Sequence, residues 1–275
     1  MYDGQAAQWH AELALQFSRV GGRTLCAQRH RGPLRVQKPL YPEGAAVCHA
    51  VVIHPPGGIA GGDVLDLSID VRAGAHALLT TPGAAKWYKA NGRPSFQRIL
   101  LGVEGVLEWL PQEAIVFDAA DVSSAIDIDL ADSGLVIGWD VVALGRRAAG
   151  ERFARGRFVQ SIRLRTGGTL TWHERTRVTG GDALLDSPVG LAGRHVFGCL
   201  WAAGAAVEHL DLDELRAELG AHATVRITRL APYLLVARAL TDGTTAAREG
   251  LTAVWQALRP RVCGRAVQTP RLWAT

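Results

Sequence analysis

The eight residues 64–71, Val-Leu-Asp-Leu-Ser-Ile-Asp-Val, decide the fold class of this chain. Large apolar side chains occupy every second position, and two aspartates and a serine lie between them. A period of two is expected for a β-strand that buries one face and exposes the other. The same alternation returns at residues 125–130, where isoleucine alternates with aspartate. Both segments therefore predict half-buried strands.

Many other short runs of this kind are separated by glycine and proline turns. The Gly167-Gly168 pair predicts a hairpin turn between strands at 161–165 and 169–173. Strands at such close spacing favour an all-β architecture: a sandwich, a barrel or a solenoid. We also expect strands at residues 13–20, 24–30, 48–53, 75–81, 98–103, 105–110, 114–117, 124–130, 135–144 and 158–177.

The last third of the chain has a different pattern. A helix is predicted at residues 212–219, because Asp211 can cap it and leucines recur on one face. A second helix is predicted at residues 245–258 and should end at Pro260. The apolar segment 196–206 is interpreted as a third, short buried helix.

Two further strands are expected within this part, at residues 224–228 and 233–240. The sequence contains neither a fixed-period repeat nor a linker. We therefore expect a single domain over residues 1–275, with a more helical subregion from about residue 192.

The composition excludes several classes of protein. The net charge is only +4 and the arginines are scattered, which does not predict a nucleic-acid-binding surface. No run of about 18 apolar residues predicts a membrane span, and residues 1–10 lack the pattern of a signal peptide. The four cysteines are far apart, with no spacing typical of structural zinc. A cytoplasmic protein fits these features best.

No motif of nucleotide binding or nucleophilic catalysis is present. The glycine-rich stretch 57–63 lacks the Gly-Lys-Ser/Thr ending of a phosphate-binding loop. It predicts a tight loop in which the backbone closely approaches another group. This loop is interpreted either as a structural corner or as a device that aims Asp63 into a cavity.

Two acidic residues occupy unusual positions. Asp140 interrupts the apolar run 135–142, and Glu174 follows Trp172 and His173. A buried carboxylate must be paired, hydrated or functional. The alternatives are an ion pair, with Arg175 or Arg177 as the partner of Glu174, or a water-filled passage lined by sparse oxygen ligands. His54, just before a proline turn, is a weak candidate metal ligand, and so is His49.

Several blocks of sequence resemble one known family, UreD (UreH), the urease accessory proteins. They follow in this order: 32–43 (GPLRVQKPLYPE), 48–49 (CH), 54–63 (HPPGGIAGGD), 81–88 (TPGAAKWY), 108–113 (EWLPQE), 138–140 (GWD), 144–146 (LGR), 255–261 (WQALRPR) and 270–273 (PRLW). The resemblance covers nearly the whole chain.

The resemblance implies a mainly β, solenoid-like stack of many short strands with two or three mostly C-terminal helices. It implies a non-catalytic scaffold that binds UreF, the GTPase UreG and apo-urease in a hetero-oligomeric complex. No cofactor would be permanently bound, and Ni²⁺ would pass through an internal tunnel. Asp63, Asp140 and Glu174 are then candidate nickel-path residues, with His54 a weaker one. The alternatives are a carboxylate-dependent glycan-processing enzyme on a β-solenoid, or a plain binding scaffold without metal traffic.

Overall fold

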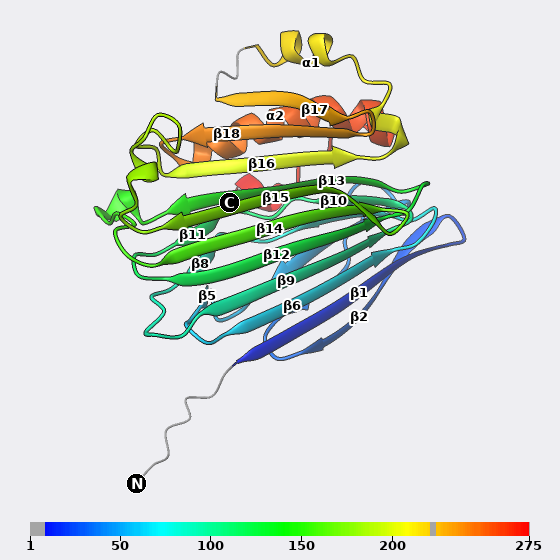
Figure 1. Cartoon of the computed structure of the whole chain (residues 1–275). Helices are drawn as coiled ribbons and strands as arrows, with labels where there is room; N and C mark the ends of the chain where they lie inside the picture. Colours follow the sequence, from blue (N-terminus) through cyan, green and yellow to red (C-terminus); the bar gives the residue numbers. More distant parts are fainter. Residues whose placement is uncertain (1–8, 221–223, 275) are drawn as a thin grey trace.

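The alternating stretch Val64–Val71 forms strand β6, whose leucines and isoleucine are buried and whose aspartates are not. The computed structural model describes residues 9–220 and 224–274, and the chain is mainly β within them. The predicted mainly β, solenoid-like fold is confirmed (Figure 1). Residues 1–8, most of the segment for which no signal peptide was predicted, lie outside the described residues.

The strands form two large sheets. The seven-stranded sheet has the order β15 (Thr169–Thr179), β14 (Arg157–Thr166), β12 (Asp121–Leu130), β9 (Ser95–Val103), β6 (Val64–Val71), β1 (His10–Val20) and β2 (Arg23–Arg31). The main path of the eleven-stranded sheet is β17 (Val225–Ala231), β18 (Leu234–Thr241), β16 (Val196–Ala203), β13 (Leu135–Leu144), β10 (Val106–Trp109), β7 (His76–Thr80), β4 (Val47–Ile53) and β3 (Arg35–Val36). Three short strands branch from it, namely β5 (Gly58–Ile59), β8 (Ala85–Trp87) and β11 (Ala114–Val116).

The middle of the chain winds as a solenoid. Strands β6, β9, β12 and β14 pair in parallel in one sheet, and β4, β7, β10 and β13 pair in parallel in the other. Strand β8 pairs in parallel with β5 on one side and with β11 on the other, which forms two short ladders. Antiparallel strands complete both sheets, including the β14–β15 hairpin predicted at Gly167-Gly168. The chain therefore alternates between two facing sheets.

The helices lie near the C-terminus, as predicted, but two details were wrong. Helix α1 (Leu212–Glu218) is capped by the Asp211 carboxylate, and helix α2 (Thr244–Cys263) covers one face of the eleven-stranded sheet. The predicted helix at 196–206 is instead strand β16, because its residues alternate between two buried faces. Helix α2 continues past Pro260, because the buried Arg259 and Val262 anchor its last turn. In the part of the chain that the structure describes, four short 3₁₀ helices occur at Arg147–Ala149, Ala183–Leu185, Ala205–Val207 and Arg271–Ala274.

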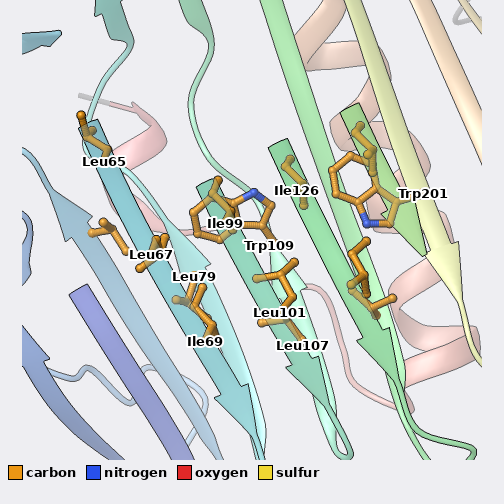
Figure 2. Packing of buried hydrophobic residues seen from close by; sticks show 14 of the residues in the cluster. Leu65, Leu67, Ile69, Leu79, Ile99, Leu101, Leu107, Trp109, Ile126 and Trp201 are labelled. Carbon is orange, nitrogen blue, oxygen red and sulfur yellow. The ribbon is translucent and has the colours of Figure 1, made fainter. Parts of the chain in front are cut away.

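Two hydrophobic cores result from this arrangement. One fills the space between the two sheets, where Trp109, Trp201 and Ile126 lie together (Figure 2). The other lies between the outer face of the eleven-stranded sheet and α2, with Trp139 and Trp255 in it. Side chains of strand β13 contribute alternately to both cores. No helix in the described part of the chain is long and apolar enough to cross a membrane.

Candidate functional site

Strand β13 places Asp140 between the two sheets. Val136 and Val142, on the same face of the strand, belong to the inter-sheet core, whereas Trp139 and Val141 pack toward α2. Because side chains alternate along a strand, Asp140 must face the inter-sheet space. An acidic side chain therefore lies in the space between the two sheets, beside the apolar core.

Asp140 begins a row of polar side chains that crosses the eleven-stranded sheet. It is opposite Cys199 of β16, Cys199 is opposite Arg238 of β18, and Arg238 is opposite Arg226 of β17. Neighbouring strands lie about 4.8 Å apart, so Asp140 and Arg238 are separated by roughly twice that distance. The row runs from the middle of the sheet to its edge.

A second row on the seven-stranded sheet faces the first. Gln97, Ser124, Gln160 and Thr176 are register partners across β9, β12, β14 and β15. The amide of Gln160 donates a hydrogen bond to Asp140 Oδ2 across the space between the sheets. The two polar rows thus meet at Asp140.

Two cavities, each of about 330 Å³, lie along these polar rows. The inner cavity is lined by His54, Gln97, Trp109, Ser124 and Asp140 among others, and the edge cavity is lined by Asp140, Gln160, Glu174, Cys199, Arg226 and Arg238 among others. Asp140 lines both cavities and therefore marks where they adjoin.

The environment of Asp140 opposes its charge. Burial raises the pKa of Asp140 above its ordinary value, and hydrogen bonds from Gln160 and the Val141 N–H only partly offset this. Burial also raises the pKa of the neighbouring Cys199 thiol to about 12, with a further contribution from the charge of Glu174. Cys199 is therefore a neutral thiol at physiological pH, and Asp140 is the group in this row whose charge a cation would stabilise.

Glu174 has an ion-pair partner that was not predicted. Its side chain faces the inter-sheet space, and its Oε2 lies 2.6 Å from Nη2 of Arg238 on the opposite sheet. The proposed pairing with Arg175 or Arg177 was wrong, because these residues alternate with Glu174 and lie on the other face of β15. The ion pair instead joins the two sheets across the edge cavity.

The glycine-rich loop keeps Asp63 outside both cavities. Asp63 Oδ2 accepts a hydrogen bond from the Ala60 N–H at 2.8 Å, which closes the loop on itself. The close backbone approach predicted for this loop is confirmed at Gly61, where a Cβ atom would collide with the Ala90 carbonyl. His54, by contrast, lines the inner cavity, and burial lowers its pKa while the charge of Asp63 partly raises it. Asp63 therefore lies outside both cavities, and its charge favours the protonated form of His54, which lines the inner one.

Two indole N–H groups in the inter-sheet core lack partners. Trp109 Nε1 and Trp201 Nε1 are buried and make no hydrogen bond within the described residues. Trp109 lines the inner cavity, and Figure 2 shows both rings turned into the space between the sheets. Since an unpaired buried N–H costs about 1–3 kcal/mol, a water beside Trp109 would stabilise the fold. The inner cavity is thus suited to contain water.

A second polar cluster, which we call the buried clamp, lies on the other face of the eleven-stranded sheet. Glu108 accepts hydrogen bonds from Arg259 Nε at 2.9 Å, from Trp255 Nε1 at 2.6 Å and from His76 Nε2 at 2.7 Å. Arg259 also contacts Glu43, which pairs with His49. Burial alone would raise the pKa of Glu108, but hydrogen bonds and charge from His76 and Arg259 outweigh it and lower the pKa.

The buried clamp also resembles a metal site in composition, because ligand atoms of His76, Glu108 and Cys263 lie within 4.8 Å of one another. Both oxygens of Glu108, however, already accept hydrogen bonds from cationic or N–H donors. Burial and the charge of Glu108 raise the pKa of Cys263 well above its ordinary value, which keeps the thiol protonated. The contacts therefore describe a structural ion-pair network that attaches α2 to the solenoid. His49, a weak metal candidate, belongs to it.

Comparison with known protein families identifies the family of this chain. The sequence model of the family described as UreD urease accessory protein matches residues 10–274. The chain belongs to the UreD family. The matched region contains the two polar rows and the buried clamp.

Individual UreD proteins are similar along almost their whole length. Urease accessory protein UreD 2 of Pseudomonas syringae pv. syringae (strain B728a) is 51% identical over 272 residues, covering 97% of this chain and 95% of the relative. UreD of Azoarcus sp. (strain BH72) is 50% identical over 270 residues, covering 97% and 94%. UreD of Nitrosococcus oceani is 47% identical over 277 residues, covering 97% and 90%.

Asp140, Glu174 and His54, which the sequence singled out, line the two cavities, whereas Asp63 does not. Their role as nickel-path residues stays a prediction. The row Gln97, Ser124, Gln160 and Thr176 was missed, and so was Arg238. A signal existed in each strand, because these polar residues occupy inward positions between apolar ones. Gln160, for example, lies between the buried Phe158 and Ile162.

Proposed function

We propose that this UreD protein is a non-catalytic urease accessory scaffold that carries Ni²⁺ toward apo-urease through its interior. The observation that supports this proposal is the junction of the two cavities at Asp140, between two facing polar rows. Its relatives are named urease accessory proteins, so maturation of urease is the common role.

The chemistry of the polar rows suits a metal in transit. A divalent cation needs oxygen ligands and negative charge to offset the loss of its water shell. Asp140 and Glu174 supply charge, while the amides and hydroxyls of the facing row supply neutral oxygens. Such sparse ligands allow a cation both to enter and to leave. Nickel is the cargo here, and the scaffold has no resident cofactor.

The proposal includes the partners that nickel delivery requires. UreF and the GTPase UreG would bind UreD, and the complex would dock on apo-urease, in the cytoplasm. The alternative of a glycan-processing enzyme gains no support from the site. Glu174 is paired with Arg238, and Asp140 lies between the sheets rather than in an open groove that could hold a sugar chain.

Neutral replacements test the passage. We expect Asp140→Asn and Glu174→Gln to reduce the nickel content and activity of urease several-fold, because both keep the shape but remove charge that offsets cation desolvation. Asp63→Asn should have a smaller effect, since Asp63 lies outside the cavities. The measurement is nickel per urease active site after co-expression, together with recovery of the accessory complex.

A matched control uses Asp129→Asn, which removes an exposed carboxylate from the outer face of the seven-stranded sheet. It should leave the nickel content unchanged. Full nickel loading in Asp140→Asn and Glu174→Gln would contradict the passage and favour a plain scaffold. Loss of the complex in these variants would instead assign the two carboxylates a structural role.

A further inference from the structure

Arg238 occupies the point where the edge cavity meets solvent. It lies between Cys199 and Arg226 in the polar row of the eleven-stranded sheet, and its side chain is 47% exposed. From β18 it reaches across to Glu174 on β15. Any ion that travels along this row between Asp140 and the sheet edge must pass the Arg238 guanidinium.

The ion pair keeps a cation from Glu174. The Arg238 guanidinium at 2.6 Å already neutralises this carboxylate, so a metal ion would have to compete with that positive charge. Arg226 lines the same cavity and adds a second positive charge near its rim. Of the two carboxylates that line the edge cavity, Glu174 is paired with Arg238, whereas Asp140 is contacted by the neutral Gln160 amide and the Val141 N–H.

The contact between Arg238 and Glu174 is one that can open. It consists of a single Nη2–Oε2 hydrogen bond, whereas Arg98 holds Asp66 through both Nε and Nη2. Bidentate arginine pairs are stronger and more fixed in geometry than single contacts. Arg259 of the buried clamp is the contrasting case: its side chain is 0% exposed and is held between two carboxylates. Arg238 is half exposed and can swing outward.

We propose that Arg238 is a movable counter-ion that closes the edge cavity, and that Asp140 and Glu174 form a divalent-cation site when Arg238 leaves Glu174. The inference deepens the proposed function, because it says how the passage is closed, and it rests on that function for the identity of the cation. The cation site itself can be tested without urease. Arg238 is a positioning residue here, since it acts on the cation through Glu174.

Direct nickel binding tests the proposal. The full-length chain, carried on a solubility fusion free of histidine tags, is dialysed to equilibrium against NiCl₂. We expect Arg238→Gln to bind Ni²⁺ roughly tenfold more tightly than the parent. An adjacent arginine stabilises a carboxylate by about one to three pKa units, and the lower value corresponds to a tenfold change in affinity. The double variant Arg238→Gln/Glu174→Gln should lose this gain.

Arg157→Gln is the matched control. It removes the partner of Asp121 in an ion pair on the outer face of the sheet, away from the edge cavity. The two ion pairs are similarly exposed: the side chains of Arg157 and Asp121 are 45% and 30% exposed, and those of Arg238 and Glu174 are 47% and 26% exposed. We expect no change in nickel affinity. An equal gain in both variants, or no gain in Arg238→Gln, would overturn the proposal. If Arg238→Gln does not fold, Arg238→Lys replaces it. We then expect a smaller gain in Ni²⁺ affinity, which Glu174→Gln should again abolish.

The failure of this proposal is distinguishable from failure of the passage. Unchanged nickel affinity in Arg238→Gln, with reduced urease loading in Asp140→Asn, would remove the gate and leave the passage standing. A Glu174-dependent gain in affinity, with normal urease loading in Asp140→Asn and Glu174→Gln, would support the cation site and remove its role in delivery.

Discussion

Asp140 and Glu108 are carboxylates on strands of the same sheet, and both are surrounded by protein, but their environments differ. Glu108 faces α2 and is held by His76, Trp255 and Arg259. Asp140 faces the inter-sheet space, where a neutral amide and a backbone N–H contact it and two cavities adjoin. Their pKa values move in opposite directions for this reason. Burial alone therefore does not identify a functional acid; its partners do.

Among the changes that test this comparison of Glu108 with Asp140, replacement of Glu108 should have the largest effect on the free energy of unfolding. Glu108→Ala leaves Trp255 and His76 without their acceptor and removes one of the two carboxylates that Arg259 needs. Breaking a buried pair in this way costs about 3–5 kcal/mol of unfolding free energy. The measurement is the urea midpoint of the purified fusion. The control, Glu104→Ala, removes an exposed glutamate paired with Arg72 and should change stability by less than about 0.5 kcal/mol. Equal midpoints in the two variants would contradict a structural clamp.

A smaller effect is expected on the inner face beside Asp140. Gly138 is opposite Trp201, and a Cβ atom there would lie 2.6 Å from the indole ring. Gly138→Ala should therefore cost about 1–3 kcal/mol, because the ring must shift within a packed core. Gly83→Ala is the control, since nothing lies within 4 Å of its Cβ position. An unchanged urea midpoint for Gly138→Ala would show that the inner face is looser than its contacts indicate.

The smallest effect concerns Asp140 and pH. Because the folded-state pKa of Asp140 is raised, its contribution favours the folded state below the unfolded pKa of about 3.9 and is lost as pH rises through the folded pKa. Asp140→Asn cannot ionise, so its Tm should rise relative to the parent over this window and then stay higher. Thermal melts of both proteins at successive pH values measure the difference. A parent that is more stable than Asp140→Asn at neutral pH would mean that a partner holds Asp140 as Glu108 is held.

The sequence predicted the strands well because alternation is a local signal. Strands β6 and β13 were predicted with their observed boundaries. Strand β6 alternates between apolar and polar residues, and β13 is a long, mostly apolar run between Gly134 and Gly145. Strand β16 was interpreted as a helix because both of its faces are buried, which removes the alternation of polar and apolar residues. The coils of the solenoid are nearly equal in length on the eleven-stranded sheet, where the register partners Val47, His76, Val106 and Leu135 are 29, 30 and 29 residues apart. On the seven-stranded sheet the partners Val64, Phe96 and Ser123 are 32 and 27 residues apart, so the two sheets share no single period that the sequence could display.

The site was less predictable because its contacts join distant strands. Asp140 and Glu174 were visible as acids in apolar or aromatic surroundings, but nothing local to Glu174 indicates that Arg238 reaches it from β18. Glu108 and Arg259 are even farther apart in the sequence, by 151 residues, and no local pattern predicts that they pair. Only the strand register brings such residues together.

The length of that last connection affects the order in which the chain can fold. Glu108 and Arg259 are separated by 151 positions, and Glu43 and Arg259 by 216. At a synthesis rate of about 5–20 residues per second, Glu108 leaves the ribosome roughly 8–30 s before the arginine that neutralises it. During that interval the growing chain holds acidic groups whose burial is unfavourable, so the face that α2 covers stays unfinished. Favourable burial of Glu108 therefore waits for α2, and a chain that ends before Arg259 leaves this face of the eleven-stranded sheet without its ion-pair partner.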